Sequence, residues 1–294
     1  MIYTVTLNPA IDYVMHPLTL DMGFTNRSSS EEVYCGGNGI NIAGILNELG
    51  VANTAMGICG GFTGDYLVNT LQDQGIAANF VRLDKGNTRI NVKLNGIVMS
   101  IVNGMGPKIP ESKLEELLAR LEVAGEGDTV VLTGSIPASL PDTTYDMIMH
   151  RLSGRGIRFV VDAPGTLLLR ALPAKPFLIK PNNHEVGRLF GAKPETPCRL
   201  VNATGAGDSM VAGFVAKTGA GADYETALNF ASACGSATAS SKGLADRMKI
   251  DKLYSALGGV LEKHRDEIQA ALERAHAMVI DATPSESAAG GAVK

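Results

Sequence analysis

The residues best suited to chemistry lie in the run NATGAGDSMVAGF, from Asn202 to Phe214. Gly205, Ala206 and Gly207 leave room for an anion beside the backbone, and the apolar spacing that follows predicts the start of a helix. Free backbone N–H groups at a helix start attract anions, and the helix dipole adds to this attraction. A carboxylate at Asp208 could accept a hydroxyl proton during phosphoryl transfer. A glycine turn followed by an Asp that serves only the dipole is the structural alternative, and this motif alone does not separate the two.

Two further motifs place polar side chains next to turns. In CGGNGINIA, residues 35–43, the glycines permit close backbone approach and Asn41 offers an amide to a ligand hydroxyl. In KPNNHE, residues 180–185, Asn182 and Glu185 are three residues apart, so in a helical turn both could face the water shell of a metal ion. A strand-to-helix turn would explain the first motif, and a capping Asn with a capping Glu would explain the second.

The elements that must position these residues alternate between strand and helix. Strands are predicted at 2–7, 129–132, 157–161 and 177–179, and helices at 38–49 and around 145–152. This alternation predicts a parallel sheet with helices on both faces. Ligands bind beyond the carboxyl ends of such strands, which is where Ser135, Asp162, Lys180 and Asn182 fall.

Two segments interrupt this alternation, and the C-terminal part has its own character. Residues 12–34 and 88–102 lack helical periodicity, so we expect them to form antiparallel strands that stand off the main sheet as a lid. Residues 251–278 predict a helix. The final segment, 281–294, is small and polar, and we expect it to be disordered.

Composition limits the classes of function. The 294 residues suit one large α/β domain, with 45% hydrophobic and 19% charged residues. A net charge of −4 and the absence of Trp disfavour a nucleic-acid partner. The four cysteines lack the CxxC spacing of zinc sites and of disulfide frameworks. There is neither a signal-peptide pattern nor an apolar run long enough to span a membrane, so we expect a soluble, cytoplasmic protein with no membrane partner.

The three motifs, in this order, resemble those of the ribokinase-like (PfkB) carbohydrate kinases. MIYTVTLNPAIDYV, GNTRINVK and TGSIPASLP match as well, and they are most similar to family members that act on fructose 1-phosphate. The resemblance covers residues 1–190 and 200–250. It implies a three-layer α/β/α fold with a small β-sheet lid, which we expect over residues 1–280. It also implies ATP, Mg²⁺ and transfer of the γ-phosphoryl group to the C6 hydroxyl of fructose 1-phosphate.

The resemblance further implies a role for individual residues. Asp208 would be the general base, and the backbone of Gly205, Ala206 and Gly207 would form the anion hole. The substrate would be held by Asp12, Arg27, Gly37, Asn41, Arg89 and Ser135, with the two arginines on the phosphate of the sugar. Asn182 and Glu185 would organise the metal through its waters and, with Thr204, Gly205 and Gly207, contact the nucleotide. A homodimer formed through the lid is a further expectation.

The chain departs from the family pattern at three places. Asn38 stands where the family usually has Lys, and Ile101 replaces an acidic residue. Only residues 186–207 separate Glu185 from Asp208, fewer than the about 30 residues of a single βαβ unit. We therefore expect a shortened nucleotide side at 186–203. Kinases of tagatose 6-phosphate or fructose 6-phosphate are the alternatives among enzymes, and a non-catalytic sugar-phosphate-binding protein is the alternative from another class.

Overall fold

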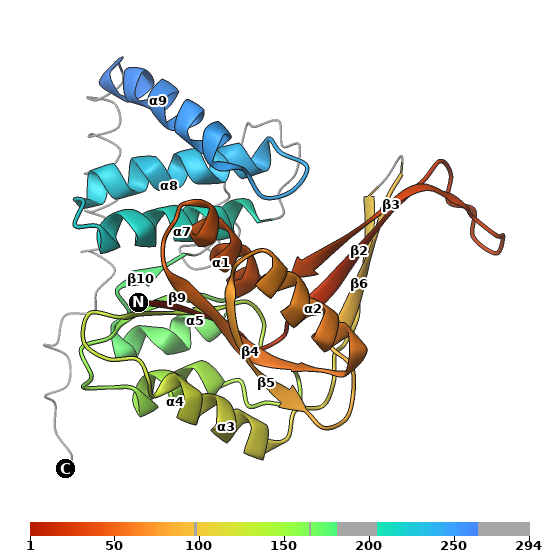
Figure 1. The fold of residues 1–294 in the computed structure, drawn as a ribbon, viewed down its shortest axis with the longest axis horizontal. Coiled ribbons are helices and arrows are strands. Elements are labelled where there is room, and N and C mark those ends of the chain that lie inside the picture. Colours follow the sequence, from red (N-terminus) through yellow and green to blue (C-terminus); the bar gives the residue numbers. More distant parts are fainter. Residues whose placement is uncertain (97–98, 165, 181–204, 264–294) are drawn as a thin grey trace, which may run out of the picture.

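The computed structural model describes residues 1–96, 99–164, 166–180 and 205–263 (Figure 1). Its centre is a six-stranded, all-parallel sheet with the strand order β10-β9-β8-β1-β4-β5. The strands are β1 (Ile2–Thr6), β4 (Asn53–Gly60), β5 (Ala77–Leu83), β8 (Thr129–Thr133), β9 (Arg158–Asp162) and β10 (Leu178–Ile179). The predicted parallel sheet is therefore confirmed, and the strand expected at 177–179 is one residue shorter.

Helices cover both faces of this sheet, which gives three layers (Figure 1). One face carries α1 (Asn38–Glu48), α2 (Gly61–Asp73) and α7 (Ala206–Gly219); α8 (Tyr224–Ala239) stacks on α7, and α9 (Arg247–Lys263) stacks on α8. The other face carries α3 (Glu111–Leu121), α4 (Thr144–Arg151) and α5 (Thr166–Ala171), followed by the short 3-10 helix η1 (Leu172–Ala174).

The alternation of side chains along each strand explains the two cores. In β8, Val130 and Leu132 pack among the helices α3 and α4, whereas Val131 packs against α1 and α7. All five residues of β8 are buried, as expected for a strand covered on both faces. The helix α3 presents Leu114, Leu117, Leu118 and Leu121 to the first core at the i, i+3, i+4, i+7 spacing of one helix face.

A second, four-stranded sheet projects from the body (Figure 1). We call it the lid. Its order is β3-β2-β6-β7, formed by β2 (Ala10–Pro17), β3 (Ser28–Gly36), β6 (Arg89–Asn95) and β7 (Met99–Asn103). The strands of each hairpin run antiparallel, as expected for residues 12–34 and 88–102, whereas β2 and β6, which join the two hairpins, pair in parallel. The reason is topological, because each hairpin leaves the body with its first strand running outward and these two first strands are neighbours.

The carboxyl ends of the main strands lie at the base of the lid. β1 leads through residues 7–9 into β2, and β3 leads directly into α1. β8, β9 and β10 end next to Gly134, Asp162 and Lys180. None of the helices in the described ranges combines the length and the apolar character needed to span a lipid bilayer. The segment expected to be disordered, 281–294, lies outside the described residues.

Candidate active site

Asp208 lies in the first turn of α7, at a helix start that is open to an anion. The residue before the helix, Gly205, has φ of 80°, a left-handed conformation that favours glycine. No side chain in the described part of the chain caps this helix start, so its first backbone N–H groups are not occupied by a cap. The Asp208 side chain itself is only 6% exposed. The structure thus joins a bare helix N-terminus to a buried carboxyl group.

Burial raises the pKa of Asp208 to about 7. A smaller opposing effect comes from Asn41, whose Nδ2 donates to Asp208 Oδ2 at 2.8 Å and so favours the charged form. The negative charge of Asp162 raises the pKa further, and the positive charge of Lys180 lowers it. A carboxyl group with a pKa near neutrality is suited to accept a proton at physiological pH.

A lysine from the neighbouring strand end reaches the same helix start. Lys180 Nζ forms an ion pair of 3.1 Å with Asp162 Oδ1. A Cβ atom built on Gly207 would lie 2.9 Å from the same Nζ, so the absence of a side chain at Gly207 lets the lysine approach the backbone this closely. The strand ends of β9 and β10 thereby bring a positive charge to the start of α7, where a transferring phosphoryl group would gain from it.

On the lid side, Asp12 is fixed by two residues of β6. Asn91 Nδ2 donates to Asp12 Oδ1 at 2.8 Å, and Lys93 Nζ contacts Asp12 Oδ2 at 2.7 Å. The carboxylate lies directly over Gly36, where a Cβ atom would be 2.7 Å from Asp12 Cγ. The glycine of the CGGNG motif is thus required by the position of Asp12, as well as by the turn into α1.

A third group of residues meets where β1 and β8 end and β6 begins. The side-chain amide of Asn8 donates to Ser135 Oγ at 3.3 Å, and the backbone carbonyl of Asn8 accepts from Arg89 at 3.1 Å. Burial lowers the pKa of the Arg89 guanidinium, an effect that the charge of Asp12 opposes. Arg89 Nε is buried and has no hydrogen-bond partner among the described residues. Arg89 is therefore a partly buried cation with unused donor capacity, and not a solvated strand arginine.

The side chains described above lie around one end of the sheet, and some of them line a common cleft. The cleft has a volume of 480 Å³, and its lining includes Asp12, Asn41, Lys93 and Leu244. Asn41 therefore contacts Asp208 on one side and borders the same cleft as Asp12 on the other. Gly37 sits at the turn into α1 with φ of 130°, and a Cβ atom there would be 2.8 Å from the Thr6 methyl.

The structure does not bring every predicted residue to this place. Arg27 is exposed and directly precedes β3, whose first residue Ser28 pairs with Pro17 at the outer end of β2. Asp12 lies five residues further in along β2, which is about 17 Å for an extended strand. Asn182, Glu185 and Thr204 lie outside the described residues, so the expected metal and nucleotide contacts there stay predictions.

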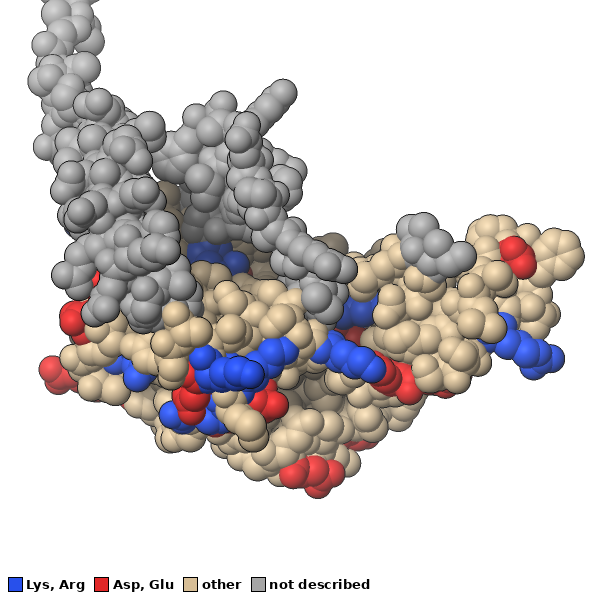
Figure 2. Space-filling view, turned by 90° about the horizontal axis from the view of Figure 1, so that it is seen from above, with Lys and Arg blue, Asp and Glu red and all other residues tan. Residues whose placement is uncertain are grey.

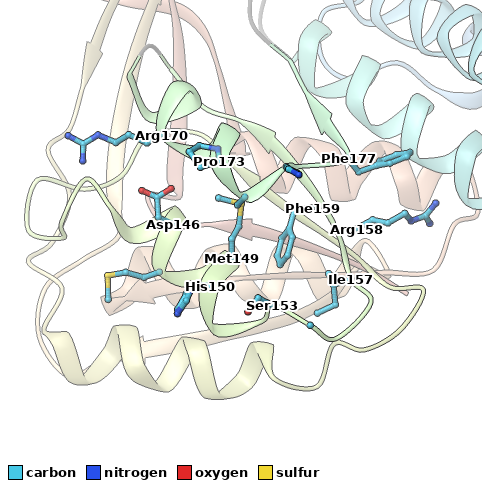
Figure 3. Close-up of a pocket in the computed structure, with 14 residues that line it drawn as sticks. Asp146, Met149, His150, Ser153, Ile157, Arg158, Phe159, Arg170, Pro173 and Phe177 are labelled. Carbon is cyan, nitrogen blue, oxygen red and sulfur yellow. The ribbon is translucent and has the colours of Figure 1, made fainter. Parts of the chain in front are cut away.

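A second hollow, larger than this cleft, lies elsewhere. It has a volume of 960 Å³ and lies between α4, the start of β9 and η1 (Figure 3). Of the predicted site residues that the structure describes, none lines it. The guanidinium groups of Arg158 and Arg170 point in opposite directions (Figure 3), and Arg170 pairs with Asp142 at 3.0 Å. This hollow therefore offers no convergent set of charges.

Comparison with known proteins identifies the family. The sequence profile described as pfkB family carbohydrate kinase matches residues 5–198 and 193–251. The chain belongs to the pfkB family of carbohydrate kinases. It is 37% identical over 295 aligned positions to a 1-phosphofructokinase of Bacillus subtilis, with 86% of this chain and 97% of the relative covered. A D-tagatose-1-phosphate kinase of Bacillus licheniformis is 31% identical, with coverages of 87% and 98%.

The fold agrees with this membership. A crystal structure of a phosphofructokinase-2 variant from Escherichia coli superposes with a TM-score of 0.81 at 25% identity, covering 87% of this chain and 99% of that one. The predicted three-layer ribokinase-like fold with a small separate sheet is confirmed. The pfkB chain is accordingly an ATP-dependent carbohydrate kinase. On the face drawn in Figure 2, Lys and Arg side chains alternate with Asp and Glu over the described residues, so this face offers no broad basic surface.

Several side chains around the kinase site carry no clear signal in the sequence. Asp162 and Lys180 were marked only by their position after strands, and nothing in the sequence indicated that they pair. Asn8 and Asn91 acquire their contacts through strand pairing between distant segments. Leu244, which would touch a Cβ atom on Gly205 at 2.8 Å, comes from the loop after α8 and has no motif around it.

Proposed function

We propose that this kinase transfers the γ-phosphoryl group of ATP to the C6 hydroxyl of fructose 1-phosphate and forms fructose 1,6-bisphosphate. The observation that carries the proposal is the buried Asp208, with a pKa near 7, at the uncapped start of α7 and in contact with Asn41. Such a carboxylate can take the hydroxyl proton while the helix N-terminus stabilises the charge on the transferring group. The 37% identity to a 1-phosphofructokinase supports this choice of substrate.

The remaining roles follow from the positions of the side chains. Asp12, Asn41 and the backbone at Gly37 would hold sugar hydroxyls in the cleft. Arg89 and Ser135, joined through Asn8, would bind the phosphate that the sugar already carries. Arg27 would contact the same phosphate only if the outer end of a lid, such as that of a partner protomer, lies close to Arg89 and Ser135.

The nucleotide would bind with its phosphates at the start of α7. The backbone N–H groups of Gly205, Ala206 and Gly207 would receive phosphate oxygens, a role that suits an uncapped helix N-terminus. Mg²⁺ would be held by Asn182 and Glu185 through water, since amide and carboxylate oxygens are the ligands that this ion prefers. When bound, the ion would neutralise charge on the phosphates.

A homodimer formed through the lid is part of the proposal. The lid exposes large apolar side chains on three of its strands and at its outer end, such as Val33, Ile90, Val102 and Phe24. An exposed apolar sheet of this kind is typical of an interface. In such a dimer, the outer end of one lid, with Arg27, could reach the site of the partner.

D-Tagatose 1-phosphate is the second candidate substrate, because a D-tagatose-1-phosphate kinase is also 31% identical to this chain. The two sugars differ only in the configuration at C4. A coupled assay of ADP release with fructose 1-phosphate, tagatose 1-phosphate and fructose 6-phosphate distinguishes them. The proposal requires fructose 1-phosphate to give the highest kcat/KM, and a higher value with either other sugar would contradict it.

Replacing Arg89 by Ala is expected to weaken binding of fructose 1-phosphate by about 10- to 100-fold, the range for a charge-assisted hydrogen bond. The reason is that Arg89 is a partly buried cation with an unpartnered Nε beside Ser135 and Asn8. Isothermal titration calorimetry measures the effect. The matched control is Arg120→Ala on α3, which removes an ion-paired arginine distant from the cleft and should leave the affinity unchanged. Equal affinities of Arg89→Ala and wild type would remove Arg89 from the site.

Recognition of the adenine base is expected to be weak, because residues 186–207 are too few for the strands and the loop that form the nucleotide side in the family. Two findings support this shortage. The alignment with the Bacillus subtilis relative is longer than the part of this chain that it covers, so it contains gaps in this chain. The family profile matches in two segments that overlap at residues 193–198. Titration with non-hydrolysable ATP and GTP analogues should give weak affinities that lie within about threefold of each other. Tight binding selective for adenine would show that other residues supply the missing contacts.

A further inference from the structure

The carboxylate of Asp12 is held in place by its neighbours on the lid. Asp12 on β2 pairs with Asn91 on β6, and Val14 pairs with Lys93, so Asn91 and Lys93 lie on the same face of the lid as Asp12. Each donates to a different carboxylate oxygen, at 2.8 and 2.7 Å. Gly36 on β3 leaves the space that the carboxylate fills. Three strands of the lid thus contribute to the position of one side chain.

A gain in folding stability is a poor explanation for the buried contacts among Asp12, Asn91 and Lys93. The side chains of Lys93 and Asp12 are 14% and 13% exposed, so both charges have lost most of their hydration. An ion pair at this depth recovers little free energy beyond its desolvation cost, and an apolar pair of similar size would pack at least as well. The pair also borders the cleft and not the core of the lid.

The hydrogen-bonding capacity of the group is only partly used. Asn91 is 8% exposed, and its Oδ1 is buried with no hydrogen-bond partner in the part of the chain that the structure describes. A buried amide oxygen without a donor costs free energy, so a missing partner is to be expected. Lys93 has three N–H groups, of which the contact to Asp12 uses one. Asp12 and Lys93 both line the cleft, so further donors of Lys93 stand beside the Asp12 carboxylate there, whereas Asn91 supports that carboxylate from a buried position.

We infer that Lys93 is a further substrate-contacting residue, which with Asp12 recognises neighbouring hydroxyls of the sugar, and that Asn91 is a positioning residue that holds Asp12. A hydroxyl both donates and accepts, so it matches an acceptor at Asp12 together with a donor at Lys93 Nζ. Two hydroxyls on adjacent carbons satisfy the pair only in one relative configuration. Arg89 and Ser135 would recognise the phosphate, whereas Asp12 and Lys93 would read the stereochemistry of the sugar. This inference rests on the proposed sugar-phosphate function.

The test compares two ligands by isothermal titration calorimetry. Fructose 1-phosphate carries both the phosphate and the sugar hydroxyls, whereas glycerol 3-phosphate carries a phosphate ester without the sugar ring. Lys93→Met and Asn91→Leu should each weaken fructose 1-phosphate by about tenfold or more and leave glycerol 3-phosphate within about twofold. Lys113→Met is the matched control, since Lys113 on α3 is also partly buried and ion-paired but lies away from the cleft. It should change neither affinity.

A second titration separates direct contact from an effect through Asp12. If Lys93 touches a hydroxyl, then wild type and Lys93→Met should bind either the 3-deoxy or the 4-deoxy form of fructose 1-phosphate equally well. A tenfold difference that persists with both deoxy forms would mean that Lys93 only positions Asp12, and would overturn the inference. So would a parallel loss of glycerol 3-phosphate affinity, or unchanged binding of fructose 1-phosphate by both variants.

Ligand binding by the wild type and folding of the Lys93→Met variant must each be checked. If wild type binds neither ligand, the proposed function itself fails, and this is distinguishable from a failure of the inference. If thermal unfolding shows that Lys93→Met does not fold, Lys93→Gln replaces it, because the amide keeps a donor for Asp12 while losing the charge. The same fold-changes are expected for that variant, and their absence would overturn the inference.

Discussion

Replacing Asp208 by Asn is expected to lower kcat by at least about 100-fold while the affinity for fructose 1-phosphate stays within about twofold. Asn cannot accept the hydroxyl proton, but it has nearly the same shape and its Oδ1 can still accept from Asn41. The loss should therefore fall on the chemical step and not on sugar binding. Initial rates from the coupled ADP assay and calorimetric titration of the same preparations measure both quantities.

The pH profile adds a second readout for the same residue. Because the base works only when deprotonated and burial raises its pKa to about 7, the wild-type rate should rise with pH through the neutral range and level off above it. Asp223→Asn is the matched control. Asp223 also lies at a helix N-terminus, where it caps α8 by accepting from the Thr226 N–H, but it is exposed. That variant should keep both the rate and its pH profile, and a near-normal rate in Asp208→Asn would exclude Asp208 as the base.

Much of the fold could be predicted because it depends on local patterns. The apolar runs that became β8 and β9 are short and bounded by turns, as buried parallel strands are. The helix expected at 38–49 forms over Asn38–Glu48, with Ile42, Ile45 and Leu46 fully buried. The parallel pairing of β2 with β6 could not be predicted in this way. It joins residues about 80 positions apart and depends on where the rest of the chain places the two hairpins.

The candidate site likewise combines features that are local in the sequence with features that are not. The GAGD motif predicted Asp208 at a helix start because glycines and an acidic first turn are local signals. The contacts that give Asp208 its chemistry are not local, since Asn41 lies 167 residues away along the chain. The same holds for the pairs Lys180–Asp162 and Lys93–Asp12, which form only once strands are neighbours. Sequence spacing therefore indicated the carboxyl group that we propose as the base, whereas its electrostatic environment required the folded structure.

Asp208 should also make the folded protein less stable as the pH rises. Its pKa is about 7 in the folded protein, against 3.8 for an unperturbed carboxyl group. Below pH 3.8 the group is protonated in both states and carries no penalty. Between pH 3.8 and 7 the unfolded chain ionises while Asp208 in the folded protein stays protonated, so the free energy of unfolding decreases. Above pH 7 Asp208 is ionised in both states, and the decrease has reached its full extent. The buried negative charge thus lowers stability at the pH at which Asp208, as the proposed base, would be active.

Asp208→Asn, which cannot ionise, is therefore expected to be more stable than wild type by about 2 to 4 kcal/mol at pH 8 and nearly equal to it at pH 4. Urea unfolding at pH 4, 6 and 8 measures the difference, which should grow through this range. Asp223→Asn is again the control, and its expected trend is opposite, because backbone hydrogen bonds lower the pKa of Asp223 and favour the charged form. If Asp208→Asn gave no more stability at pH 8 than at pH 4, the folded protein would not resist ionisation of Asp208. That result would contradict the raised pKa of Asp208 on which its proposed role as the base rests.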